Sequence, residues 1–167
     1  RAGNVIGGGD YSKDRLVPDI YKSIKNNQKI VLRNPNSVRP WQHVLEPLSG
    51  YIILAEKMYK NLNNSISPNW NFGPNISSCK SVKYIAQKFS KSSNCKIQII
   101  KVKNKNYKSE TDLLRLSNFK SKRYLKWYPK WNLNKTINKI IEWNYEVNKT
   151  KKAFNICSKQ IDEYLKD

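Results

Sequence analysis

The sequence predicts a mixed α/β domain in which amphipathic helices alternate with short strands. Three observations predict this class. Apolar residues recur at helical spacing in several segments, short β-type runs lie between those segments, and clusters of Gly, Pro and Asn separate the two kinds. No internal repeat and no low-complexity linker interrupts the pattern. A chain of 167 residues is long enough for one domain with its own core.

The expected elements follow from these patterns. Segment 16–26 has apolar side chains at helical spacing and Pro18 in its first turn, where a helix accommodates proline. Glu46 and Pro47 open a helix with a wide apolar face that runs to Met58. Further helices are expected at 81–90, 118–125, 133–147 and 160–165. Strands are expected at 29–33, 69–72 and 96–102, a turn at 34–37, and a loop at the three consecutive glycines 7–9.

The formal net charge of +20 invites a nucleic-acid interpretation, but the type and spread of the cations disfavour it. Only six of the cations are arginines, whose forked guanidinium groups suit phosphates and base edges. The lysines are spread through the chain and are not gathered in one arm. We therefore expect no nucleic-acid partner.

Hydropathy and cysteine spacing indicate where in the cell the protein is expected. The longest apolar run, 51–55, is followed at once by Glu56 and Lys57, so no membrane-spanning helix is expected. The three cysteines are far apart and form no Cys-x-x-Cys pair, which favours reduced thiols in the cytoplasm over a disulfide framework or a zinc site. These are Cys79, Cys95 and Cys157. The chain begins at Arg1 in what reads as the middle of an element, so we expect a piece of a longer protein.

Four stretches carry residues that are suited to binding. The first, 1–10 (RAGNVIGGGD), combines small side chains, which let a ligand approach the backbone, with the donor and acceptor of Asn4. In the second, Arg15 lies at a helix start, where the helix dipole favours anions, so a ligand phosphate or base would explain a cation there. Both stretches also have an interpretation without a ligand. The glycines fit a tight surface turn, and Arg15 fits a charge exposed to solvent.

The third stretch, 33–44, places Arg33 and Arg39 on either side of a turn and contains His43, the only histidine. Guanidinium groups pair with a diphosphate in a bidentate way, and a histidine titrates near neutral pH. A lone histidine beside a helix start is more often structural. The fourth stretch, 70–74 (WNFGP), contains Asn71 and, taken alone, fits a core strand that ends in a turn.

Together and in this order, the four stretches resemble the extended short-chain dehydrogenase/reductases, which join a Rossmann half to a smaller substrate half. The matching motifs are Arg-x-x-Asn-Val-x-Gly at 1–7, Leu-x-Pro at 16–18, Arg-x-Trp-x-x-Val at 39–44 and Asn-x-Gly at 71–73. The longer strings RPWQHVLEPLSGY and WNFGP resemble the CDP-glucose 4,6-dehydratases within that family. The resemblance covers residue 1 to about residue 148. It departs at Tyr11, Ser117 and Lys126, the last of which replaces a glycine that ends a helix.

The resemblance implies an α/β chain that forms the C-terminal substrate-binding part of such an enzyme and lacks most of the Rossmann sheet. Residues 1–148 would be the substrate-binding half, and 149–167 a basic tail with a short helix. Relatives oxidise C4 of a hexose by hydride transfer to bound NAD, eliminate water across C5 and C6, and return the hydride to C6. The expected whole protein is a cytoplasmic, homo-oligomeric lyase that acts on CDP-glucose, in the biosynthesis of lipopolysaccharide O-antigen sugars.

The same resemblance implies roles for individual residues. The residues that would contact the sugar nucleotide are Asn4, Arg15, Leu16 and Arg39. Those that would line or support the pocket are Arg33, His43 and Asn71. The backbone of Ala2 and Gly3 would lie near the nicotinamide. The family's glycine-rich NAD fingerprint, catalytic tyrosine and lysine, and acid/base carboxylate lie upstream of the position that matches Arg1. No catalytic residue is therefore assigned, and the chain alone is expected to be inactive and to fold poorly without its N-terminal Rossmann half.

Two other interpretations stay open. One is a different extended short-chain enzyme, such as a dTDP-glucose dehydratase or an epimerase. The other is a non-catalytic basic binding module, whose binding to DNA would depend strongly on salt.

Overall fold

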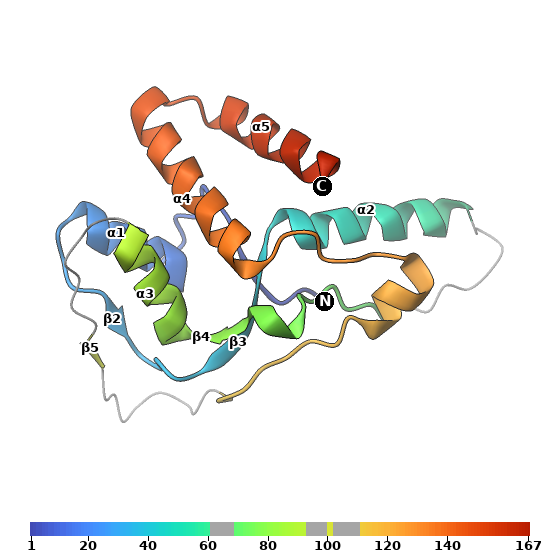
Figure 1. The fold of residues 1–167 in the computed structure, drawn as a ribbon, viewed down its shortest axis with the longest axis horizontal. Helices are drawn as coiled ribbons and strands as arrows, with labels where there is room; N and C mark the ends of the chain where they lie inside the picture. Colours follow the sequence, from blue (N-terminus) through green and yellow to red (C-terminus); the bar gives the residue numbers. More distant parts are fainter. Residues whose placement is uncertain (61–68, 93–99, 102–110) are drawn as a thin grey trace.

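The computed structural model describes residues 1–60, 69–92, 100–101 and 111–167, and in it helices surround a small sheet (Figure 1). Three strands form this sheet in the order β1-β3-β4. Strand β1 (Asn4–Ile6) pairs in parallel with β3 (Val38–His43), and β4 (Cys79–Ser81) pairs antiparallel with β3. Strands β2 (Val31–Leu32) and β5 (Ile100–Lys101) form a separate parallel pair. The parallel β1–β3 pair requires a crossover, and the chain makes it through α1 (Leu16–Lys25).

The helices begin and end close to where apolar spacing predicts them. Besides α1, the described residues form α2 (Leu45–Lys60), α3 (Val82–Ser92), α4 (Leu133–Thr150) and α5 (Ala153–Lys166). A 3-10 turn, η1 (Ile76–Ser78), and a π-helix, η2 (Ser121–Leu125), are also present. The helices expected at 16–26, 81–90 and 133–147 are confirmed, because their apolar stripes are the buried faces of α1, α3 and α4.

Two apolar clusters form the core. The larger cluster joins Ile6 and Trp41 of the sheet to the buried faces of α1, α3 and α4. The smaller cluster contains Phe72 and Trp127 and packs against Ile53 and Leu54 of α2. The sheet belongs to the larger cluster and contacts the smaller one through Gln42 of β3, whose side chain donates to the carbonyl of Phe72 at 2.9 Å.

The strands agree less well with expectation. The strand expected at 69–72 is reduced to an isolated bridge between Phe72 and Ala2. The strand expected at 96–102 is present at Ile100–Lys101, and the rest of it lies outside the described residues. The sequence does not predict β3, whose residues include Pro40, yet β3 is the central strand of the three-stranded sheet.

The C-terminal segment is longer and more closely packed than a short helix in a basic tail. Helix α5 begins at Ala153, well before the expected start near residue 160, and buries Ile156, Gln160 and Tyr164. The division of the chain at residue 148 stays a prediction. Lys126, which stands where relatives carry glycine, takes the left-handed conformation that ends η2, with φ of 55°. None of the described helices is long and apolar enough to span a lipid bilayer.

Candidate functional site

The first residues of the chain run between β3 and the segment that contains Phe72. The backbone N–H of Phe72 donates to the carbonyl of Arg1 at 2.8 Å, and Ala2 bridges to Phe72. On the other side, Asn4 lies opposite Trp41 in the parallel pair of β1 and β3. This arrangement brings several predicted site residues onto three adjacent segments: Ala2, Gly3 and Asn4 on the first, Arg39 on the second and Asn71 on the third.

Gly3 and Asn4 show what this strand can offer a ligand. A Cβ atom on Gly3 would come within 2.5 Å of the carbonyl oxygen of Pro40, so close packing on β3 already requires glycine here. Asn4 is partly exposed, and its side chain makes no hydrogen bond to another described residue. Its amide can therefore donate to and accept from a ligand without breaking such a bond.

Arg39 is held in place by backbone carbonyls. Its guanidinium donates to the carbonyl of Val38 at 3.0 Å and to that of Thr111 at 2.7 Å. The segment after Thr111 runs beside β3, because the N–H of Val38 donates to Asp112 and the N–H of Leu114 donates to Val38. Half-buried and fixed in this way, Arg39 loses little side-chain entropy when it binds a further acceptor.

Two cations near Arg39 are not among the residues that the sequence predicts. Lys80 of β4 lies opposite Arg39 in the antiparallel pair. Burial raises the pKa of the neighbouring Cys79 thiol, while the positive charges of Arg115 and Lys80 lower it, so Arg115 lies near Cys79 of β4. Arg115 belongs to a Leu-Leu-Arg-Leu run that resembles the family. The sequence does not show where this run lies; the pairing of segment 111–114 with β3 places the start of the run next to the strand that carries Arg39.

Arg15, Leu16 and Arg33 lie elsewhere, around the start of α1. Arg15 precedes this helix and pairs with Asp10 at 3.2 Å, and Arg33 pairs with Asp14. Burial raises the pKa of Asp10, but the Ser12 N–H and Arg15 together hold it below its usual value. Leu16 packs against the larger apolar cluster. These residues form a separate group of paired charges, and their proposed contact with a nucleotide stays a prediction.

His43 ends β3 deep inside the molecule, where only 2% of its surface is exposed. Its ring lies 4.8 Å from that of Trp131, and the N–H of Leu45 donates to its Nδ1 at 3.3 Å. Burial lowers the pKa of His43 to about 4, and the positive charge of Lys139 acts in the same direction. These observations favour the structural alternative for His43, a neutral ring that supports the end of β3.

The glycine loop has a packing role in this structure. The ring of Trp143 on α4 lies so close to Gly8 that an added Cβ would be 2.2 Å from it. Gly9 has φ of 77°, a conformation that glycine adopts without strain. The loop therefore packs on α4 through Gly8 and Gly9, which fits the alternative of a tight turn.

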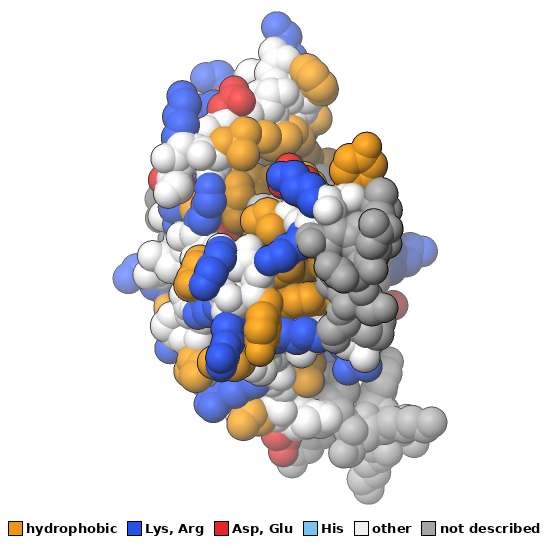
Figure 2. Space-filling view, turned by 90° about the vertical axis from the view of Figure 1, so that its right-hand side faces the viewer, with side chains coloured by type: hydrophobic (Ala, Val, Ile, Leu, Met, Phe, Trp, Pro, Cys, Tyr) orange, Lys and Arg blue, Asp and Glu red, His pale blue; other side chains and the backbone are white. Residues whose placement is uncertain are grey.

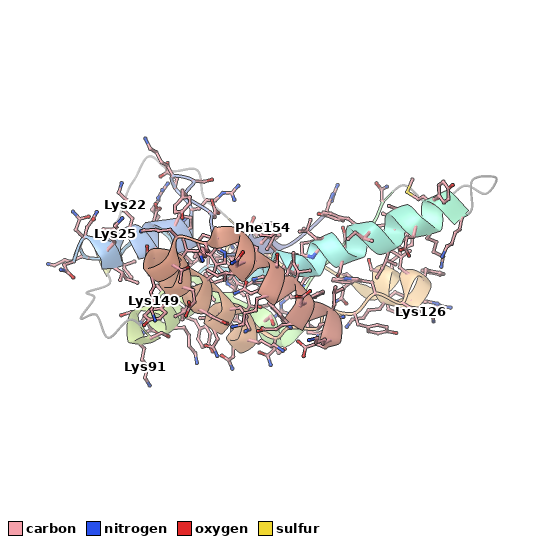
Figure 3. All side chains as sticks on the ribbon, turned by 90° about the horizontal axis from the view of Figure 1, so that it is seen from above. Lys22, Lys25, Lys91, Lys126, Lys149 and Phe154 are labelled. Atoms are coloured by element: carbon pink, nitrogen blue, oxygen red, sulfur yellow. The ribbon has the colours of Figure 1, made fainter. Side chains whose placement is uncertain are left out.

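Positive charge is spread over several elements and does not form one stripe. Lys25, Lys91 and Lys149 lie in the last turns of α1, α3 and α4 and point outward from them (Figure 3). Figure 2 shows lysines and arginines interspersed with apolar side chains over one face of the molecule. A cation in the last turn of a helix is favoured by the helix dipole, so these lysines have a local electrostatic role.

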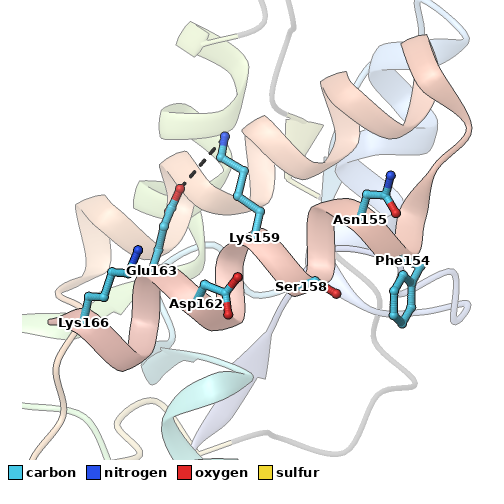
Figure 4. A pocket seen from close by; sticks show the side chains of 7 residues that line it. All are labelled: Phe154, Asn155, Ser158, Lys159, Asp162, Glu163 and Lys166. Carbon is cyan, nitrogen blue, oxygen red and sulfur yellow. Dashed lines mark ion pairs between the residues drawn. The ribbon is translucent and has the colours of Figure 1, made fainter.

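An open hollow of about 520 Å³ lies on the outer side of α5 (Figure 4). Six of its seven lining residues are polar or charged, and it extends from Phe154 at one end to Lys166 at the other. Lys159 and Glu163 form an ion pair at 3.9 Å beside it. None of the predicted site residues lines this hollow.

Comparison with known proteins matches both the sequence strings and the fold. Over 166 residues the chain is 42% identical to CDP-glucose 4,6-dehydratase of Salmonella typhimurium, and the alignment covers 99% of this chain and 45% of that protein. The chain thus spans less than half the length of this curated relative. No family model matches the chain.

Solved structures of similar fold include the dTDP-glucose 4,6-dehydratase of Bacillus anthracis in complex with NAD. It has a TM-score of 0.71 at 17% identity over 87% of this chain and 43% of that one. The UDP-glucose 4-epimerase of Thermotoga maritima with UDP-glucose has a TM-score of 0.72 at 15% identity over 88% of this chain and 45% of that one.

Proposed function

We propose that this chain belongs to the extended short-chain dehydrogenase/reductase family and is the sugar-nucleotide-binding part of a nucleotide-sugar 4,6-dehydratase. The whole protein would act on CDP-glucose and release a CDP-4-keto-6-deoxyhexose. The observation that carries this proposal is the 42% identity to a CDP-glucose 4,6-dehydratase over nearly the whole chain.

The described geometry supports a binding role for the surface of the paired strands β1 and β3 that carries Asn4 and Arg39. Asn4 and Arg39 lie on adjacent parallel strands, and Arg39 is positioned by two carbonyls before any ligand arrives. In the proposed complex, the guanidinium of Arg39 pairs with the diphosphate and the amide of Asn4 donates to a phosphate oxygen. Lys80 opposite Arg39 on β4, and Arg115 near Cys79 of the same strand, add positive charge on the β4 side of Arg39, which favours an anionic ligand near this arginine.

The cofactor of the whole protein is proposed to be NAD, which accepts a hydride from C4 of the hexose and returns it to C6. From this chain, Ala2 and Gly3 would adjoin the nicotinamide. This contact would be made by their backbone, and the close packing of Gly3 on Pro40 is a separate requirement for glycine at that position. The described residues take no chemical step in this proposal; they bind and orient the sugar nucleotide.

The outer face of α2 supports a second part of the proposal, that the remainder of the whole protein packs on this helix. An apolar stripe there is exposed: Leu48 at 45%, Ile52 at 63%, Met58 at 53% and Tyr59 at 76%. Apolar surface of this extent along one helix is typical of an interface. More than half of the relative's length lies outside the alignment, so we propose that its Rossmann half covers this stripe.

Turnover by the whole protein tests the proposed function. The protein is incubated with NAD and either CDP-glucose or dTDP-glucose, and mass spectrometry follows the loss of one water from each sugar nucleotide. We expect rapid dehydration of CDP-glucose and little of dTDP-glucose. Preference for dTDP-glucose, or a product of unchanged mass as an epimerase gives, would favour the other extended short-chain enzymes.

A further inference from the structure

The C-terminal helix α5 is attached to the molecule mainly by polar contacts. Only Ile156 and Tyr164 among its apolar side chains are buried, whereas Phe154 and Leu165 are 81% and 69% exposed. By contrast, α4 buries four apolar side chains, namely Leu133, Ile137, Ile140 and Trp143. Burial of apolar surface is the largest favourable contribution to folding, so α5 is bound less firmly than α4.

Hydrogen bonds at the C-terminal end of α5 hold it to two other elements. The hydroxyl of Tyr164 donates to Glu46 of α2 at 2.9 Å, and it also lies 3.0 Å from the hydroxyl of Ser49. From the loop before α4, Lys130 donates to the carbonyl of Tyr164 at 3.0 Å, and the indole N–H of Trp131 donates to Asp167 at 2.6 Å. Together, these hydrogen bonds hold the C-terminal end of α5 against α2 and the loop before α4.

This end of α5 covers a series of ring contacts that runs from Tyr164 through Trp131 to His43. The ring of Trp131 lies 5.2 Å from that of Tyr164 and 4.8 Å from that of His43. His43 in turn lies opposite Ile6 in the pair of β1 and β3. Because Tyr164 packs on one side of Trp131, removal of α5 would open a path for water toward the end of β3.

At the other end, α5 joins α4 through a short link. Lys151, which follows α4, has φ of 58°, and Lys152 precedes α5. The ion pairs between the two helices, Lys139 with Glu163 and Lys159 with Glu142, are partly exposed to solvent, which weakens them. Two hydrogen bonds also join the helices: Gln160 donates to the carbonyl of Lys139 at 2.8 Å, and the indole N–H of Trp143 donates to the sulfur of Cys157 at 3.3 Å. The left-handed residue at the link can act as a hinge once these polar contacts break.

We propose that α5 is a detachable strap, which undocks while the other helices stay folded and whose docked state seals Trp131 and His43 from water. The titratable and charged groups that face this junction come from every element packed there: Glu46 on α2, Lys130 in the loop, Lys135 and Lys139 on α4, Tyr164 on α5, and Asp167 after it. This inference rests on contacts within the described chain and is independent of the proposed dehydratase function.

Hydrogen exchange on the whole protein, of which this chain is a part, tests the strap, with Tyr164→Phe as the perturbing variant. This substitution keeps the ring against Trp131 but removes the donor to Glu46. We expect peptides from 153–167 to exchange ~10-fold or more faster than peptides from 133–147, and Tyr164→Phe to accelerate the α5 peptides a further ~10-fold while α4 is unchanged. Leu165→Ala, at an exposed position of the same helix, is the matched control and should change neither.

The titration of His43 gives a second readout. In the NMR titration of the ring protons of His43, Tyr164→Phe should raise the observed pKa toward 6.5, because undocking hydrates the imidazole. Equal exchange of α4 and α5, or equal acceleration of both by Tyr164→Phe, would place the two helices in one cooperative unit and overturn the proposal. An unchanged His43 titration in a variant whose α5 exchanges faster would overturn the sealing role.

Discussion

Tyr164 donates its hydroxyl to the carboxylate of Glu46 at 2.9 Å, which joins residues 118 positions apart. Glu46 is fully buried, and its carboxylate also accepts the N–H of Trp131 at 2.6 Å and that of Lys130 at 3.1 Å. Burial raises the pKa of Glu46, while these backbone donors and Tyr164 act to lower it. A buried carboxylate thus connects the start of α2, the loop before α4 and the C-terminal helix.

Glu46→Ala should reduce the free energy of unfolding by about 3–5 kcal/mol, because it leaves two buried backbone donors without an acceptor. Glu46→Gln should cost less, since its amide oxygen still accepts and no charge is buried. Urea unfolding measures both, with Glu56→Ala on the exposed side of α2 as the control. A loss for Glu46→Ala no larger than that for Glu56→Ala would contradict the assigned role.

His43 should be neutral throughout the physiological pH range. Its pKa in the folded chain, about 4, lies below that of an unfolded histidine, about 6.5. The unfolded state therefore binds a proton first as pH falls, and stability should decline between pH 6.5 and 4 with a slope that approaches about 1.4 kcal/mol per pH unit from this group. The decline should be weaker in His43→Gln, and an NMR titration midpoint of His43 near 6.5 would refute the burial argument.

Lys126→Gly should stabilise the chain by about 0.5–1 kcal/mol. Lys126 holds a left-handed conformation at the end of η2, which costs a residue with a Cβ atom about 1 kcal/mol and costs glycine little. Lys126→Ala removes the same side chain without relieving the backbone, so the difference between the two variants isolates the conformational effect. Thermal unfolding of both gives the comparison, and equal melting temperatures would contradict it.

The exposed stripe on α2 should be needed for assembly with the rest of the whole protein. We expect Ile52→Asp to abolish co-purification of this chain with a separately expressed N-terminal part, because it places a charge in the proposed interface. Ile161→Asp changes an exposed apolar residue on α5 and is the control. Normal co-purification of Ile52→Asp would exclude this face as the interface.

Local sequence patterns predict the helices of this fold better than its strands. The stripes of α1, α3 and α4 are visible because each helix carries its own buried face at regular spacing. Strand β3 contains Pro40 and its last four residues are all buried, so no polar–apolar alternation marks it. The role of Glu46 could not be predicted for a different reason: its partners lie 84 to 118 residues away, and nothing near Glu46 in the sequence indicates them.

The candidate site was predictable only in part, and for a related reason. Motif order identifies the segments that carry Asn4 and Arg39 but does not predict that they are strands; the structure pairs them as β1 and β3. The positive charge that Lys80 and Arg115 add near β3 could not be predicted, because segments far away in the sequence pair with this strand. The sequence left open whether His43 lines a pocket or is structural, and the contact that favours the structural role comes from Trp131 in a distant loop.

The affinity of the whole protein for CDP-glucose, measured with Arg39→Ala, tests the central claim most directly. Calorimetry on the wild type, Arg39→Ala and the surface control Arg123→Ala gives three dissociation constants. Loss of a charge-assisted, bidentate contact to the diphosphate should weaken binding by Arg39→Ala by about 10- to 100-fold, while Arg123→Ala binds like the wild type. Equal affinity in all three proteins would contradict the assignment of the surface that carries Asn4 and Arg39, on β1 and β3, as the sugar-nucleotide site.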